Sequence, residues 1–290
     1  MASGNMKAIK RRIKSVESTK QITKAMELVA SSKLRKAKEK ADNSRPYFNA
    51  LYETMCEIQA ENKSFFSPYT RKGRKGTVLL VVIAGDRGLA GGFNSNVIKL
   101  AQKRISEITA DGKTNVEILG IGKKSVEYFE KHGYDLLARY VNIGETLKIG
   151  SAAGIAEKIV NPYLKGEYER VELFYTDFTS AISQTAMSKA ILPVEIREEK
   201  SEGIKALPIY EPSVEQVFNS IVPKYLSGII FCAVVDSFAS EQAARRNAME
   251  SASDNADEIL SDLSLKYNRA RQASITQELT EIVGGASAQE

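Results

Sequence analysis

Two long stretches without glycine or proline, one near each end, constrain the fold of this chain more than any other feature. They run from Asn5 to Arg45 and from Ile229 to Val283, and both are rich in helix-forming residues. At about 1.5 Å per residue they predict helices of roughly 60 Å and 80 Å. A compact domain built from the middle of the chain would have a radius of gyration of only about 14 to 15 Å. Helices of this length must therefore extend beyond that domain.

Both stretches carry a narrow seam of apolar residues that step by three and four positions. In the first stretch the seam follows Ile9, Ile13 and Val16, slips to Ile22, Met26 and Val29, and continues on a neighbouring line at Ala30, Leu34, Ala37 and Ala41. In the second it follows Met249, Ala252, Ala256, Ile259, Leu263, Tyr267, Ala270 and Ala273. Seams this thin are typical of coiled coils. We expect the two helices to wind around each other in antiparallel orientation, with the C-terminal helix as the longer partner.

The residues between these stretches change their period. The β-branched run from Thr77 to Ala84 is typical of a strand buried on both faces, and a helical pattern follows from Phe93 to Thr109. Further strands are expected at 116–121, 171–178 and 190–196, and further helices at 123–131 and 152–163. Alternating strands and helices favour a mostly parallel sheet that is covered on both faces.

The predicted fold class is therefore α/β, with a long antiparallel coiled coil of N- and C-terminal helices plus a Rossmann-like α/β domain. We expect three segments along the chain. Residues 1–76 would form the N-terminal coiled-coil helix and a linker, residues 77–208 the Rossmann-like domain, and residues 209–290 the C-terminal coiled-coil helix.

The composition excludes several classes of protein. The two cysteines, Cys56 and Cys232, are far apart, and His132 is the one histidine, so no disulfide framework, zinc site or histidine-dependent triad can be assembled. The apolar runs are shorter than the roughly 20 residues of a membrane-spanning helix, and no signal sequence is recognisable. We expect no catalytic residue, no metal and no cofactor.

The most tempting chemical site is a glycine-rich turn, GDRGLAGG, between a predicted strand and a predicted helix. Its glycines are Gly85, Gly88, Gly91 and Gly92, and their spacing fits neither the GxGxxG nor the GxxxxGK[ST] nucleotide fingerprint. We interpret the motif as a structural turn that lets a helix pack closely on a strand. A Rossmann-type nucleotide enzyme with helical extensions remains the first alternative.

Positive charge is concentrated at the N-terminal end. Residues 1–45 hold 13 lysines and arginines against four acidic residues, although the whole chain has a net charge of only +5. Such a segment is either a solvated helix face or a surface that meets an acidic partner. A coiled-coil nucleic-acid binder is the second alternative, but it is disfavoured because the basic clusters share the helix with an apolar seam and lack interleaved aromatic residues.

Four segments closely resemble the gamma subunit of F-type ATP synthases, and they span essentially the whole chain. They are residues 9–33 (IKRRIKSVESTKQITKAMELVASSK), 85–94 (GDRGLAGGFN), 240–249 (SEQAARRNAM) and 265–285 (LKYNRARQASITQELTEIVGG). The cysteine-containing insertion of chloroplast relatives is missing, and no transit peptide is recognisable. The resemblance is therefore to the bacterial type.

The resemblance implies a non-catalytic central rotor shaft that couples proton-driven rotation of the membrane c-ring to ATP synthesis or hydrolysis. Its implied partners are the alpha and beta subunits of the F1 hexamer, the epsilon subunit and the c-ring of Fo, with no nucleic acid. It would lie peripherally on the cytoplasmic side of the bacterial cell membrane without spanning it. The matched motifs imply contacts with the alpha/beta hexamer for Lys20, Lys24, Met26, Lys33, Arg245, Arg271, Gln272 and Thr276.

Overall fold

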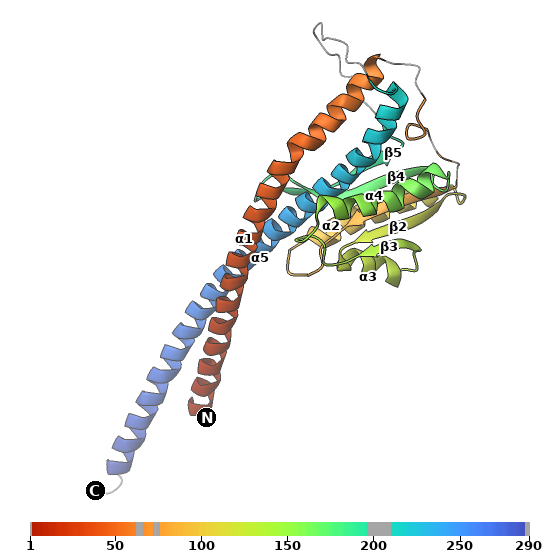
Figure 1. Ribbon diagram of the computed structural model, residues 1–290. Coiled ribbons are helices and arrows are strands. Elements are labelled where there is room, and N and C mark those ends of the chain that lie inside the picture. The colour runs from red at the N-terminus through yellow and green to blue at the C-terminus, as the bar shows by residue number, and fades with distance from the viewer. Residues whose placement is uncertain (1, 62–65, 72, 74–75, 196–209, 288–290) are drawn as a thin grey trace. The chain divides into compact units, whose positions relative to one another are not determined.

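The chain forms two compact units. A computed structural model describes the chain except residues 1, 62–65, 72, 74–75, 196–209 and 288–290 (Figure 1). The smaller unit combines Met1–Ser31 with Arg245–Glu290, and the larger unit is Ser32–Ala244. Helices α1 (Ala2–Glu61) and α5 (Val214–Ser287) contribute residues to both units. The predicted segment boundaries near residues 76 and 208 divide the chain along its sequence rather than in space, and they remain a prediction.

The larger unit contains a five-stranded sheet in the order β3-β2-β1-β4-β5. Its strands are β1 (Thr77–Ile83), β2 (Asn115–Ile121), β3 (Leu136–Tyr140), β4 (Arg170–Phe178) and β5 (Gln184–Leu192). Strand β1 pairs in parallel with β2 and with β4, and β2 pairs in parallel with β3. Strand β5 runs antiparallel to β4. The connecting helices are α2 (Phe93–Thr109), α3 (Lys123–Lys131) and α4 (Ile149–Leu164). The predicted α/β fold class is confirmed.

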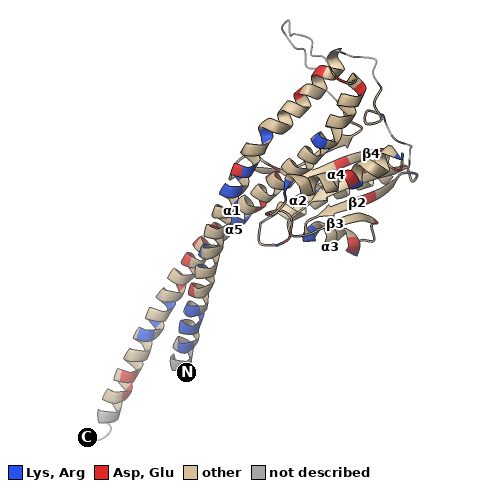
Figure 2. Cartoon of the chain, in the orientation of Figure 1, with Lys and Arg blue, Asp and Glu red and all other residues tan. Residues whose placement is uncertain are grey.

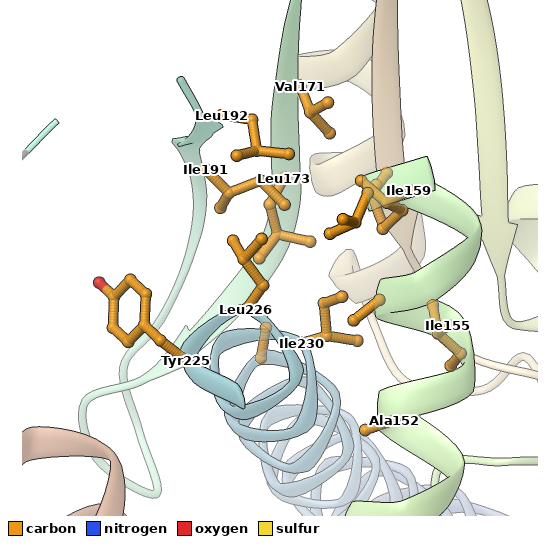
Figure 3. Close-up of a cluster of buried hydrophobic side chains, with 14 of the residues drawn as sticks. Ala152, Ile155, Ile159, Val171, Leu173, Ile191, Leu192, Tyr225, Leu226 and Ile230 are labelled. Atoms are coloured by element: carbon orange, nitrogen blue, oxygen red, sulfur yellow. The ribbon is translucent and has the colours of Figure 1, made fainter. Parts of the chain in front are cut away.

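The sheet is buried on both faces because alternate residues of β1 enter two different cores. Val78, Leu80 and Val82 pack in the cluster that contains the apolar face of α2. Their neighbours Leu79 and Val81 belong to a larger cluster with residues of α1, α4 and α5. Figure 3 shows part of this second core, in which side chains of α4, α5, β4 and β5 meet. A strand with two buried faces must be apolar throughout, which explains the uninterrupted run in β1.

Two strand predictions need correction. The last strand, expected at residues 190–196, is β5 and already begins at Gln184. Most of its side chains are at least partly exposed, and only Ile191 and Leu192 are buried, so the apolar signal covers only its end. Strand β3 was not predicted, because its five residues include one buried side chain, Ala138.

Helix α5 is strongly apolar where it crosses the larger unit. It holds an 18-residue window with a mean hydropathy of 1.5, which is long and apolar enough to cross a membrane by composition alone, but 56% of that window is buried inside the protein. Ile230 and Val234 belong to the core beside the sheet, and the Phe231 ring lies 6.2 Å from that of Phe48 on α1. The window is therefore the central helix of a protein core.

The contact between α1 and α5 in the larger unit also includes an ion pair. Arg45 Nη2 lies 3.2 Å from Asp236 Oδ1, whose side chain is 12% exposed. Burial raises the pKa of Asp236, while Arg45 acts in the opposite direction. The carboxylate of Asp236 is therefore less favourable in the folded chain than in the unfolded one.

This pKa shift predicts how Asp236→Asn alters the pH dependence of stability. Because the folded pKa is raised, wild-type stability should fall relative to that of Asp236→Asn as the pH rises from about 4 through the folded pKa. Urea unfolding of both proteins between pH 4 and pH 8 measures this difference. Asp262→Asn, an exposed substitution on α5, is the control and should follow the wild type. A difference between wild type and Asp236→Asn that does not vary with pH would contradict the prediction.

The smaller unit is an antiparallel pair of helices. Thr23 shares a buried hydrogen bond of 2.7 Å with Ser253, and Lys20 forms an ion pair with Asp257, so α1 and α5 run in opposite directions. On each helix, one line of buried and half-buried positions steps by four and three residues without interruption. On α1 they are 9, 13, 16, 20, 23, 27 and 30, and on α5 they are 249, 253, 256, 260, 263, 267, 270 and 274. This spacing is a coiled-coil heptad repeat.

The predicted slip of the α1 seam is wrong. Ile22 and Val29 are 58% and 56% exposed, and the seam passes instead through Lys20, Thr23 and Glu27. On α5 the buried seam residue is Ser253 and not the predicted Ala252, and the predicted seam residue Ile259 is 45% exposed. Polar side chains can occupy seam positions because they find hydrogen-bond or ion-pair partners there. The spacing of the apolar residues alone therefore predicts the wrong seam.

The Thr23–Ser253 hydrogen bond should appear as a coupling energy. Thr23→Ala and Ser253→Ala are each expected to lower the free energy of unfolding, and the double variant should lose less than the sum by about 1 kcal/mol. Urea unfolding of the four proteins, followed by far-ultraviolet circular dichroism, measures the cycle. Thr54→Ala is the control for Thr23→Ala, because the Thr54 hydroxyl bonds to the Ala50 carbonyl of its own helix. Strictly additive losses for Thr23 and Ser253 would refute the coupling.

Candidate partner-binding surfaces

The predicted basic contact residues on α1 are all engaged within the chain. Lys20 pairs with Asp257 and Lys24 with Glu27 in the smaller unit, while Lys33 pairs with Glu145 in the larger unit. The hydrogen bond with Glu27 raises the pKa of Lys24. Figure 2 shows further basic residues along the N-terminal part of α1. An acidic partner would therefore compete with internal carboxylates for these lysines.

Met26 belongs to an apolar stripe on the outside of the helix pair. The stripe, which we call the outer stripe, consists of Ile22, Met26 and Val29, at spacings of four and three that place them on one face of α1. Ile22 and Val29 are more than half exposed, and Met26 is partly buried. The same spacing of apolar residues in the sequence predicts that they belong to the seam, whereas the structure places them outside it. An apolar face on a helix whose seam is already filled is available to another protein.

The end of α5 extends beyond the helix that pairs with it. The register set by Thr23 with Ser253 and by Lys20 with Asp257 places the first residue of α1 opposite about residue 275. Ser274 is the last buried residue among the α5 side chains that the structure describes, which end at residue 284. Ile275, Leu279, Ile282 and Val283 follow and are 48%, 58%, 68% and 67% exposed. We call residues 275–283 the α5 tip.

Of the predicted C-terminal contact residues, Arg271 and Gln272 immediately precede this tip and Thr276 lies within it. Arg271, Gln272 and Thr276 are exposed, and the Thr276 hydroxyl donates to the carbonyl of Gln272 within the helix. Arg245 differs from them because it is only 8% exposed. A partner can reach Arg271 and Gln272 directly, whereas Arg245 is enclosed by its own chain.

The glycine-rich turn is held by side chains of the α/β unit. The backbone N–H of Gly85 donates to Asn94 Oδ1 at 2.7 Å, and a β-carbon on Gly85 would lie 2.9 Å from the Glu241 side chain. Asp86 accepts hydrogen bonds from the backbone N–H groups of Lys123 and Asn142, both at 2.9 Å. A side chain at position 85 would have to displace the end of the Glu241 side chain, and these contacts agree with a structural role for the turn.

The tip of this turn presents a strained apolar residue. Leu89 has a φ of +60°, a left-handed conformation that is unfavourable for leucine, and its side chain is 67% exposed. Such strain is often retained at functional contacts. Leu89 could not be identified from the sequence, because neither the backbone conformation nor the exposure is evident from the residue type.

The described part of the chain offers little for catalysis. It contains no group of three or more His, Cys, Asp or Glu side chains that could hold a metal ion. Both cysteines are free thiols, and burial raises the pKa of Cys232 to about 11, which keeps it protonated and unreactive at neutral pH. Its exposed apolar features include the outer stripe, the α5 tip and Leu89.

An α/β unit whose terminal helices form a coiled coil with uncovered apolar side chains has the features of a subunit in a larger assembly. The sequence model of the family described as ATP synthase matches residues 5–289. The ATP synthase gamma chain of Ruminococcus albus is 54% identical over 96% of both chains, and that of Desulforamulus reducens is 39% identical over 97% of this chain and 98% of the relative. This chain belongs to the ATP synthase gamma chain family.

Two solved structures have similar folds. A chain of the central stalk and c-ring structure of the Tetrahymena thermophila mitochondrial ATP synthase is 27% identical, with a TM-score of 0.58, over 80% of this chain and 99% of that one. A chain of the rotor of the Euglena gracilis mitochondrial enzyme has a TM-score of 0.64 at 17% identity, over 94% and 99% of the two chains. The second likeness shows the fold alone.

Relief of the strain at Leu89 should be measurable in the isolated chain. Leu89→Asn is expected to raise the free energy of unfolding by about 1 kcal/mol, because asparagine tolerates the left-handed conformation better than leucine does. Urea unfolding measures the change. Ile182→Asn is the control, since Ile182 is 89% exposed and lacks a left-handed φ, and it should give no gain. Equal effects of both substitutions would show that Leu89 is not strained.

Proposed function

We propose that this chain is the central rotor shaft of an F-type ATP synthase and contacts its alpha/beta hexamer through the coiled-coil unit. In this role the chain is a non-catalytic subunit of an enzyme that makes or hydrolyses ATP. The observation that carries the proposal is the α5 tip, where four large apolar side chains lie beyond the end of the partner helix. Membership in the gamma chain family supports it.

The α5 tip has the chemistry of a helix end enclosed by other subunits. Its apolar residues gain free energy when they are covered, at about 25 cal/mol per Å² of apolar surface. Arg271, Gln272 and Thr276 supply polar groups next to them. An apolar centre with polar groups around it is the usual composition of a protein interface. We assign the tip to the pore of the alpha/beta hexamer.

The outer stripe and the neighbouring lysines form a second contact surface. Ile22, Met26 and Val29 offer apolar area, while Lys20 and Lys24 lie on the same helix segment. An acidic loop of a beta subunit could bind these lysines in place of Asp257 and Glu27. Such an exchange of ion pairs has a small net free energy, so the contact can form and break repeatedly.

Rotation has a physical effect because the faces of the helix pair differ chemically. One face of α1 is apolar at the outer stripe, whereas α5 exposes the acidic residues Asp254, Asp257 and Glu258. A surrounding beta subunit meets a different face at each angle. If its two conformations contact these faces with different free energies, each angle favours one of them. The shaft therefore needs no catalytic residue of its own.

The remaining partners of the proposed complex are the epsilon subunit and the c-ring of Fo. Through them the chain would be attached to the membrane without entering it, on the cytoplasmic side of a bacterial cell membrane. The Tetrahymena thermophila structure, whose title names the central stalk and c-ring, supports the association with a c-ring.

The proposal is tested by making the α5 tip polar. We expect the triple variant Ile275→Ser, Leu279→Ser and Ile282→Ser to bind co-expressed alpha and beta subunits at least about 100-fold more weakly, since each covered side chain contributes about 1 to 2 kcal/mol. Size-exclusion chromatography and the ATPase activity of the complex are the measurements.

Matched controls separate assembly from folding. Leu164→Ser removes a 43% exposed leucine from α4 in the larger unit and should leave assembly unchanged. Thermal unfolding of the isolated triple variant should match the wild type, because the tip lies outside the helix pair. A triple variant that assembles and turns over like the wild type would overturn the assignment of the tip to the hexamer.

A further inference from the structure

A small cavity lies near the carboxyl end of β4, between the N-terminus of α2 and the start of β5. The chain continues from β1 through α2 to β2 on one side of β1, whereas β4 lies on its other side. This reversal is the topological switch point, where open α/β sheets most often bind ligands. The cavity has a volume of about 120 Å³, and its lining includes Gly91, Gly92, Asn96, Thr176 and Gln184. We call it the switch-point cavity.

Thr176 provides an unpartnered polar group at this cavity. Its side chain belongs to a residue that is only 3% exposed, and its Oγ1 has no hydrogen-bond partner among the described residues. Its backbone is fully engaged, since its N–H donates to Ser237 Oγ at 3.0 Å and its carbonyl accepts from Ser240 Oγ at 3.3 Å. A buried hydroxyl without a partner costs about 1 to 3 kcal/mol. The cavity beside Thr176 is the space in which a partner would fit.

The N-terminus of α2 gives this space a positive potential. Helix α2 has 17 residues, and its N-cap residue, Gly92, makes no side-chain capping bond. The first-turn N–H groups of an α-helix lack partners within the helix and attract anions together with the helix dipole. In α2 the Phe93 N–H already donates to the Ala90 carbonyl at 3.2 Å and the Asn96 N–H to the Gly92 carbonyl at 2.9 Å, so the donors are the N–H groups of Asn94 and Ser95. No acidic side chain is among the lining residues that would oppose an anion. Gly91, at a φ of +54°, allows the backbone to turn at the cavity wall.

We propose that the switch-point cavity binds a tetrahedral oxyanion of the size of inorganic phosphate. The Thr176 hydroxyl and the first turn of α2 are the donors, and the Asn96 amide lies at the same wall. The volume suits one small ion, because pockets for larger ligands measure about 300 to 1,000 Å³. The ligand is thus a free oxyanion and not a nucleotide, consistent with the absence of both nucleotide fingerprints from the glycine-rich turn.

The test is thermal unfolding of the full-length chain in increasing inorganic phosphate at constant ionic strength. The Tm of the wild type should rise and saturate in phosphate, because a ligand that binds only the folded state stabilises it. Thr176→Val keeps the shape and removes the hydroxyl. Its Tm without phosphate should equal or exceed that of the wild type, and its apparent affinity for phosphate should be at least tenfold weaker.

Two further variants make the result specific. Thr179→Val removes an exposed hydroxyl just after β4 and should respond to phosphate like the wild type. Asn96→Ala removes an exposed amide at the cavity wall and should also weaken the response. It serves as the second test if Thr176→Val fails to fold.

The choice of ion separates the outcomes. A saturable response to sulfate as well as phosphate supports a general oxyanion site. A response to ADP without a response to phosphate overturns the proposal in favour of a nucleotide site. A wild type that responds to neither phosphate nor sulfate overturns it as well, and would assign the cavity to ordered water.

Discussion

The coiled-coil pairing of α1 with α5 is the constraint on which the contact surfaces depend. The seam closes through alternate steps of three and four residues, and the Thr23–Ser253 hydrogen bond fixes its register. Once the register is fixed, the N-terminal end of α1 lies opposite the region of Ser274. Residues 275–283 of α5 therefore extend beyond α1. The exposed tip is therefore a direct consequence of two helices of unequal length.

Polar residues in the seam have a second consequence. Because Thr23 and Lys20 occupy positions that apolar residues usually fill, Ile22 and Val29 are displaced to the outside of the pair. The seam gives up some hydrophobic free energy, and the outer stripe becomes available to another subunit. A seam of hydrogen bonds and small residues also specifies pairing more strictly than a uniformly apolar one.

The larger unit has the sheet and helix arrangement of common α/β folds, but its glycine-rich turn matches neither nucleotide-binding fingerprint. Two cores cover the sheet, and the reversal of strand order leaves the switch-point cavity beside Thr176. Among the glycines that precede α2, Gly85 lies close to the side chains of Glu241 and Asn94, and Gly91 adopts a positive φ of +54°. A fold shared with nucleotide-binding enzymes therefore does not carry their function, which depends on the residues at the site.

The sequence alone determined the two terminal helices, the mostly parallel character of the sheet and the concentration of positive charge, because these follow from local propensity and periodicity. The order of the strands in the sheet came only from the tertiary structure. It did not determine which line of residues on α1 faces α5, since Ile22 and Thr23 are adjacent and only the partner helix decides between them. The sequence also could not predict that Thr176 Oγ1 lacks a hydrogen-bond partner among the described residues, that Leu89 is strained or that Arg245 is buried. Each of these depends on which distant segments meet around the residue, and that information exists only in the folded chain.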